Sequence, residues 1–137
     1  MKKKFMPRII VFWLSIKLFT GCETVADCIV GINPNLISKE LAEGSVGKNY
    51  SDSLTFEMEH ANNKDYYISD ISIEGDLPPG IEKFATYDTI TFSGIPTNSG
   101  EFNFTVKITV DPYIYNSDGT DDLCGNVSLE NYKIIIH

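Results

Sequence analysis

Hydrophobic and polar residues alternate along short segments from about residue 50 to the end of the sequence. The clearest case is EFNFTVKITVD (101–111), in which every second residue from Phe102 to Val110 is aromatic or β-branched. A period of two predicts a strand with one face in a core. The same pattern predicts strands in SLTFEMEH (53–60), KDYYISDISIEG (64–75), KFATY (83–87), TITFSG (89–94) and VSLENYKIIIH (127–137).

The fold class follows from these segments, which are short and separated by turns rich in Gly, Pro, Asn and Asp. No segment after residue 21 has a helical period. We therefore expect an all-β protein, an antiparallel β-sandwich over residues 45–137. Residues 22–44, which include Pro34 and Gly44, lack alternation and are predicted to form a tether with one short strand at 36–41.

The first 21 residues have the pattern of a secretory signal peptide, with a basic head followed by a hydrophobic run from Ile9 to Thr20. A membrane-spanning helix needs about 20 apolar residues, and this shorter run is interrupted by Lys17. The run ends in LFTGC (18–22), which resembles the lipobox of bacterial lipoproteins. The resemblance implies that Cys22 is diacylated and becomes the first residue of the mature chain.

Lipidation at Cys22 would anchor the protein to a bacterial membrane through acyl chains, and two chains suffice for stable anchoring. We then expect a place in the cell envelope, at the outer membrane or the cell surface. A plain secreted chain and an uncleaved signal anchor are the alternatives.

Charge is divided unevenly between the leader and the rest of the chain. Five of the eleven basic residues precede Cys22, so the mature chain keeps six basic and nineteen acidic residues, a net charge of −13. Such a surface repels nucleic acid and anionic lipid headgroups. We expect no nucleic-acid partner, and membrane attachment through lipid rather than through a basic patch.

Two cysteines remain after Cys22. An even pair in a small exported domain favours a disulfide, so Cys28 and Cys124 are predicted to be bonded to each other. Two separate buried thiols are the alternative.

Two turns carry a resemblance to a known family. LPPGI (77–81) and GIPTNSG (94–100), followed by an aromatic strand rich in valine, resemble the turns of a bacterial Ig family close to the dystroglycan-type cadherin-like domains. Leu77, Pro79 and Gly80 match the first turn; Gly94, Pro96, Thr97 and Gly100 match the second. The resemblance covers about residues 44–137 and implies an immunoglobulin-like sandwich that acts as a spacer, adhesion module or ligand-binding unit.

Candidate binding residues gather in DPYIYNSDGTDDLCGN (111–126). Tyr113 and Tyr115, together with Tyr66 and Tyr67 on another strand, would offer flat rings to a sugar, although the alternation of Tyr113 and Tyr115 favours packing against the sandwich edge. The carboxylates of this loop that would join them are Asp118, Asp121 and Asp122.

Calcium prefers hard oxygen donors such as these carboxylates. The order of ligands in an EF-hand, however, requires an acid at every second position before its glycine, and Ile114 occupies the first of these positions. A solvated acidic loop with turn-forming Asp and Gly is the favoured explanation, so no cofactor is predicted, and a calcium site is the alternative.

Catalytic motifs are absent from the sequence: the two histidines are not in a metal-ligand spacing, and there is no G-x-S-x-G or phosphate loop. We therefore expect a noncatalytic lipoprotein that presents its Ig-like domain to an envelope protein or a glycan. The alternative is a structural or assembly subunit that acts through a sheet edge, with the terminal strand NYKIIIH (131–137) as the candidate edge.

Overall fold

Strands account for most of residues 31–116 and 123–137, the part of the chain that the computed structural model describes. The strands after residue 49 lie where their alternating sequences predict them, within a few residues at each end. The elements are β1 (Asn33–Leu36), β2 (Tyr50–Glu59), the 3-10 turn η2 (Asn63–Asp65), β3 (Tyr66–Gly75), β4 (Ile81–Ala85), β5 (Thr89–Gly94), β6 (Gly100–Pro112) and β7 (Val127–Ile136).

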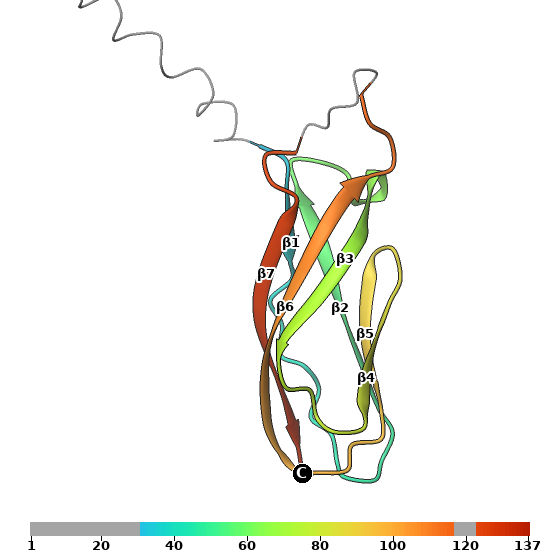
Figure 1. The fold of residues 1–137 in the computed structure, drawn as a ribbon, viewed down its shortest axis with the longest axis vertical. Coiled ribbons are helices and arrows are strands. Elements are labelled where there is room, and N and C mark those ends of the chain that lie inside the picture. Colours follow the sequence, from blue (N-terminus) through green and yellow to red (C-terminus); the bar gives the residue numbers. More distant parts are fainter. Residues whose placement is uncertain (1–30, 117–122) are drawn as a thin grey trace, which may run out of the picture. The chain divides into compact units, whose positions relative to one another are not determined.

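The strands form two antiparallel sheets, which pack against each other (Figure 1). One sheet has the order β1-β2-β5-β4 and the other β3-β6-β7. If the strands are lettered A to G in chain order, these sheets are ABED and CFG, the strand order of immunoglobulin constant-type domains. The predicted all-β, Ig-like sandwich is confirmed.

The core lies between the sheets and takes every second residue of the long strands. In β6 the expected run is buried from Phe104 to Val110, and in β7 Tyr132, Ile134 and Ile136 are buried. Antibody domains join strands B and F by a disulfide. Here the corresponding strands β2 and β6 contain no cysteine, and Phe92 of one sheet packs edge-on against Phe104 of the other at 5.3 Å between ring centroids.

Residues 32–44 belong to the sandwich, whereas the sequence pattern places them in the tether. β1 pairs with β2, with Leu36 opposite Phe56, and it lies before the expected strand at 36–41. The chain then crosses to the other sheet, where Gly44 forms a parallel bridge with Ile136. Burial of Leu36 and Leu41 explains the difference, because two core side chains hold a segment that has no alternation. The folded unit therefore begins at Ile32.

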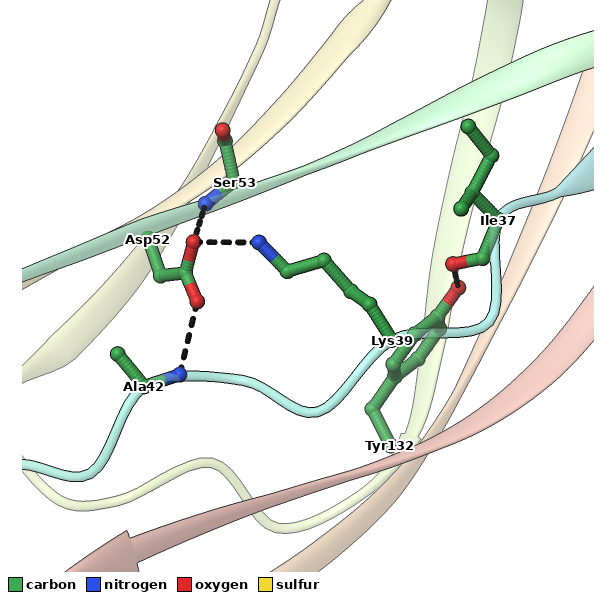
Figure 2. Close-up of polar contacts among 6 residues, drawn as sticks. All are labelled: Ile37, Lys39, Ala42, Asp52, Ser53 and Tyr132. Atoms are coloured by element: carbon green, nitrogen blue, oxygen red, sulfur yellow. Dashed lines mark hydrogen bonds and ion pairs between the residues drawn. The ribbon is translucent and has the colours of Figure 1, made fainter.

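An aspartate holds this crossing segment in place. Asp52 occupies a core-facing position of β2, opposite Phe92 of β5. Figure 2 shows its carboxylate accepting hydrogen bonds from Lys39 Nζ at 2.6 Å, the Ala42 N–H at 2.8 Å and the Ser53 N–H at 2.7 Å. One side chain thus fastens the segment to the first sheet.

A tyrosine fastens the same segment to the second sheet, since the Tyr132 hydroxyl of β7 donates to the Ile37 carbonyl at 2.9 Å (Figure 2). Tyr50 is equally buried, but its hydroxyl has no hydrogen-bond partner among the described residues. Burial raises the pKa of both tyrosines to about 12, with smaller contributions from the charges of Asp52 at Tyr50 and Glu130 at Tyr132. Two buried hydroxyls in one core therefore differ in a single hydrogen bond.

The two turns that carry the family resemblance lie against each other. Gly80 has φ 94° and Gly94 has φ 152°, and a Cβ on either would overlap the backbone near the other. The Ile95 N–H donates to the Gly80 carbonyl at 3.1 Å, and the Thr97 N–H donates to the Pro79 carbonyl at 2.9 Å. Glycine is required at both positions because the backbones approach so closely.

A lysine closes the side of the sandwich where the edge strands β3 and β4 face each other. Lys83 of β4 is opposite Phe92 and so takes a core-facing position, but its ammonium reaches across to the Ile71 carbonyl of β3 at 2.8 Å. The Ile68 N–H of β3 donates to the Tyr87 carbonyl at 2.7 Å. An inward charge on an edge strand discourages pairing with another chain.

Over residues 31–116 and 123–137, no helix has the length and hydrophobicity needed to cross a membrane.

Candidate functional site

Three tyrosines from separate parts of the chain meet beside the β3 edge and form what we call the tyrosine cluster: Tyr67, Tyr87 and Tyr113. The rings of Tyr67 and Tyr113 lie 4.9 Å apart between centroids with an interplanar angle of 33°. Tyr87 meets both edge-on, at 6.2 Å from Tyr67 and 6.3 Å from Tyr113. These distances are those of favourable aromatic pairs, so the rings support one another.

Each ring is positioned by backbone hydrogen bonds of the sandwich. Tyr67 lies on β3, opposite Asp111 of β6. Tyr113 follows β6, and its N–H donates to the Asp65 carbonyl at 2.9 Å, which ties the end of β6 to the β2–β3 connection at the upper end of Figure 1. Tyr87 lies in the β4–β5 turn, and its carbonyl accepts a hydrogen bond from the Ile68 N–H of β3. The backbone of each tyrosine in the cluster is therefore held in place by the folded sandwich.

The cluster nonetheless remains open to solvent. Tyr87 is 68% exposed and Tyr113 is 52% exposed, although each packs against two other rings. Both line a groove of about 530 Å³, which we call the end groove. Its lining residues come from the β1–β2 connection, β2, η2, the start of β3, the β4–β5 turn and the segment after β6: Ile37, Thr55, Phe56, Glu57, Asn63, Lys64, Tyr66, Thr86, Tyr87, Asp88 and Tyr113.

The end groove exists because β5 is shorter than β2. β5 begins at Thr89, opposite Thr55, and β2 continues past it to Glu59. Asn63 takes the place of a partner strand there, since its amide oxygen accepts from the Met58 N–H and its amide nitrogen donates to the Phe56 carbonyl, both at 2.7 Å. At the bottom of the groove, the edge of β2 therefore has its backbone groups hydrogen-bonded to Asn63.

Hydrogen-bonding side chains surround the aromatic wall. Glu57 and Asp88 bring carboxylates, Asn63 an amide, Thr86 a hydroxyl and Lys64 an ammonium. The Asp88 carboxylate is fixed by the Thr86 hydroxyl at 3.2 Å and the Thr89 hydroxyl at 3.0 Å. Donors and acceptors beside flat rings are the usual composition of a small-ligand site.

The binding residues expected from the sequence are brought together only in part. Tyr113 and Tyr67 join the tyrosine cluster, and Tyr66 lines the end groove. Tyr115 is 47% exposed and does not line the groove, so its part in binding stays a prediction. Asp118, Asp121 and Asp122 lie outside the described residues.

The cysteines fall mostly outside the described part. Cys124 is disulfide-bonded. Cys28, its predicted partner, and the predicted lipidation residue Cys22 lie outside the described residues, so both assignments stay predictions. Within residues 31–116 and 123–137, no group of three or more His, Cys, Asp or Glu side chains is arranged to hold a metal ion.

Tyr87 is the aromatic site residue that the sequence analysis does not predict, and the polar groove residues are not predicted either: Glu57, Asn63, Lys64, Thr86 and Asp88. The sequence pattern predicts a strand in KFATY that ends at Tyr87, whereas β4 ends at Ala85 and Tyr87 lies in the β4–β5 turn. The available signal was its setting in Thr-Tyr-Asp-Thr (86–89), where a large ring among turn-forming residues is exposed.

The terminal strand is paired on both sides at its end. Beyond its pairing with β6, the Ile135 carbonyl accepts from the Gly44 N–H at 2.8 Å, and the His137 carbonyl accepts from the Val46 N–H at 2.9 Å. A partner strand would have to displace these bonds, so the end of β7 is not an open edge for strand addition.

Comparisons with known proteins assign no family to this chain. No family model matches the chain, and no curated protein matches it. Among solved structures, the endo-fucoidan hydrolase MfFcnA9 of glycoside hydrolase family 107 matches 78% of this chain with 21% identity and a TM-score of 0.49, and the match spans 17% of the hydrolase.

The GspB Siglec domain matches 77% of the chain and 57% of its own length, with 16% identity and a TM-score of 0.48. The titin M3 domain matches 74% of the chain and 96% of its own length, with 15% identity and a TM-score of 0.42. We draw no functional inference from these similarities, and the fold assignment rests on the strand order.

Proposed function

We propose that this protein is a bacterial lipoprotein, anchored through Cys22 in the cell envelope, whose noncatalytic Ig-like domain binds a ligand at the end groove. The observation that carries the binding role is the tyrosine cluster. Two large rings remain more than half exposed although neighbours hold them in place. Rings that are ordered before binding lose little conformational entropy when a ligand arrives, which favours affinity.

The anchoring part of the proposal is supported by the sequence of the leader. A basic head, a short hydrophobic run and LFTGC precede a mature chain with a net charge of −13. That charge opposes attachment to anionic headgroups, and two acyl chains would overcome it. A disulfide between Cys28 and Cys124 would be the second role for the cysteines.

The anchor is tested by the intact mass of the protein extracted from membranes of its native host, with and without reduction and alkylation. We expect a chain that begins at Cys22 and carries acyl chains, with one disulfide revealed by reduction. A chain that keeps its leader, or that begins elsewhere without lipid, would refute the anchor.

The binding role is tested by photo-crosslinking in living cells, with a benzophenone amino acid in place of Tyr87. The matched control is the same amino acid in place of Phe84, an aromatic residue that is 55% exposed on β4 and does not line the end groove. We expect a specific adduct from position 87 and none from position 84. Equal or absent adducts at both positions would contradict a binding role for the groove.

A further inference from the structure

We infer that the end groove binds a neutral oligosaccharide, with a sugar ring packed on Tyr87 and Tyr113. This inference rests on the proposed binding function and names the ligand class of the same groove. It follows from three properties of the groove: its exposed rings, its mixture of hydrogen-bonding groups, and its charge.

The first property is the aromatic wall. The C–H face of a pyranose is apolar and carries a small positive charge, and it therefore packs well on the electron-rich face of an aromatic ring. Tyr87 and Tyr113 are 68% and 52% exposed and both line the groove. Their mutual contact at 6.3 Å between centroids, and their contacts with Tyr67, hold the two rings in fixed directions.

The second property is the variety of polar groups beside these rings. Each sugar hydroxyl both donates and accepts, so a saccharide needs acceptors and donors around its rim. The carboxylates of Glu57 and Asp88 accept, the Lys64 ammonium donates, and the Thr86 hydroxyl, which donates its hydrogen to Asp88, can accept. A groove for an apolar peptide side chain would not need this mixture.

The third property is charge, which separates neutral saccharides from acidic ones. The groove holds two carboxylates, Glu57 and Asp88, and one ammonium, Lys64. The mature chain around it has a net charge of −13. Uronic, sialic or sulfated sugars would meet repulsion both on approach and in the groove.

The groove is also large enough for a short chain of sugars. It has a volume of about 530 Å³ and is lined by residues from six segments of the sandwich. At its bottom, the backbone groups of β2 are already hydrogen-bonded to Asn63. A ligand therefore does not have to supply hydrogen bonds to unpaired backbone groups. A short stretch of glycan fits these features.

The test is saturation-transfer NMR with the full chain and a panel of neutral probes: maltotetraose, cellotetraose, mannotriose and galactotriose. A mannuronate tetramer serves as the anionic probe. We expect saturation transfer to at least one neutral probe and weaker or no transfer to the mannuronate. No transfer to any neutral probe, or a preference for the mannuronate, would overturn the inference.

Variants then locate the site. Tyr87→Ala and Tyr113→Ala should each weaken binding of the neutral probe about tenfold, because each removes one packed ring. Phe84→Ala should leave binding unchanged, and Tyr87→Phe, which keeps the ring, should retain most of it. Circular dichroism and thermal unfolding check that each variant is folded. Binding that survives both alanine substitutions in folded protein would overturn the inference.

Failure of this inference and failure of the proposed function are distinguishable. If no neutral probe binds but the crosslinker at position 87 captures an envelope protein, the groove is a protein-binding site and only the saccharide inference falls. If no probe binds and position 87 gives no adduct, both fall.

Discussion

Asp52 is the residue whose removal gives the most informative test of the fold. It is a charged residue at a core-facing position of β2, and its side chain is 18% exposed. Asp52→Ala removes its hydrogen bonds to the Ala42 N–H and to Lys39 Nζ. A hydrogen bond to a charged group contributes about 1.5–3 kcal/mol. Lys39 is 37% exposed, so its ion pair adds less than about 1 kcal/mol.

The expected loss in the free energy of unfolding is therefore about 2–4 kcal/mol for Asp52→Ala. Asp52→Asn keeps the size of the side chain, but its NH2 group would face a donor, so a loss of about 1–2 kcal/mol is expected. Each kcal/mol lowers the melting temperature of a domain of this size by about 4–8 °C. Urea denaturation at pH 7 measures the losses directly.

The advantage of wild type over Asp52→Asn should also depend on pH. Burial acts to raise the pKa of the Asp52 carboxyl, but hydrogen bonds from Lys39, Ala42 and Ser53 and the charge of Lys39 outweigh it, so the pKa lies below its ordinary value. A carboxyl whose pKa is lowered by folding stabilises the protein above its unfolded-state pKa of about 3.9. The advantage should be complete at neutral pH and disappear as the pH falls through the lower folded-state pKa.

Glu101→Gln is the matched control for this prediction. Glu101 pairs with Lys133 at 3.7 Å, but it is 62% exposed, so its loss should change the free energy of unfolding by less than about 0.5 kcal/mol. The reasoning is refuted if Asp52→Ala costs no more than Glu101→Gln, or if the wild-type advantage over Asp52→Asn persists unchanged in acid.

Other features of the fold give three further predictions. Tyr132→Phe should lower the free energy of unfolding by about 1 kcal/mol, because the Tyr132 hydroxyl donates to a backbone carbonyl. Tyr50→Phe should leave the free energy of unfolding unchanged or raise it, because the Tyr50 hydroxyl has no partner among the described residues. Equal losses for the two variants in urea denaturation would contradict this. Gly94→Ala should cost at least about 2 kcal/mol in the same assay, because its Cβ would overlap a neighbouring backbone carbonyl, and Gly47→Ala, with φ 74° but open space, should cost only about 1 kcal/mol. Lys83→Val should speed aggregation, measured by light scattering, because the inward charge of an edge strand is lost, and Lys83→Arg should behave like wild type.

Most of the sandwich can be predicted from the sequence because its long strands have one buried face. Burial on one face imposes a period of two, and that period is visible from Phe102 to Val110 without any knowledge of the partner strands. Residues 32–44 have no such period. Their place depends on distant contacts, such as the Leu36 N–H with the Ser128 hydroxyl at 2.9 Å and Gly44 with Ile136, which local patterns do not encode.

The candidate site is harder to predict for a related reason. Tyr67 and Tyr113 stand out as aromatic residues near polar loops, but nothing in the sequence joins them to Tyr87. The three meet only because the two sheets stack and bring the β4–β5 turn of one sheet against the β3 edge of the other. Asp52 is a different case. Its carboxylate lies in the core-facing register of β2, where the pattern calls for a hydrophobic residue, and this conflict marks a residue that anchors the structure.

The parallel bridge at the end of β7 has a mechanical consequence. Residues 44–46 and 135–137 run in the same direction and are joined by three backbone hydrogen bonds, from Gly44 to Ile135, from His137 to Gly44 and from Val46 to His137. A pull between residue 32 and residue 137 would move these two segments in opposite directions along their common axis. The bonds would then share the load and break together in shear, instead of opening one after another. A domain tethered at its N-terminal side and pulled at its C-terminal side would resist extension at this bridge.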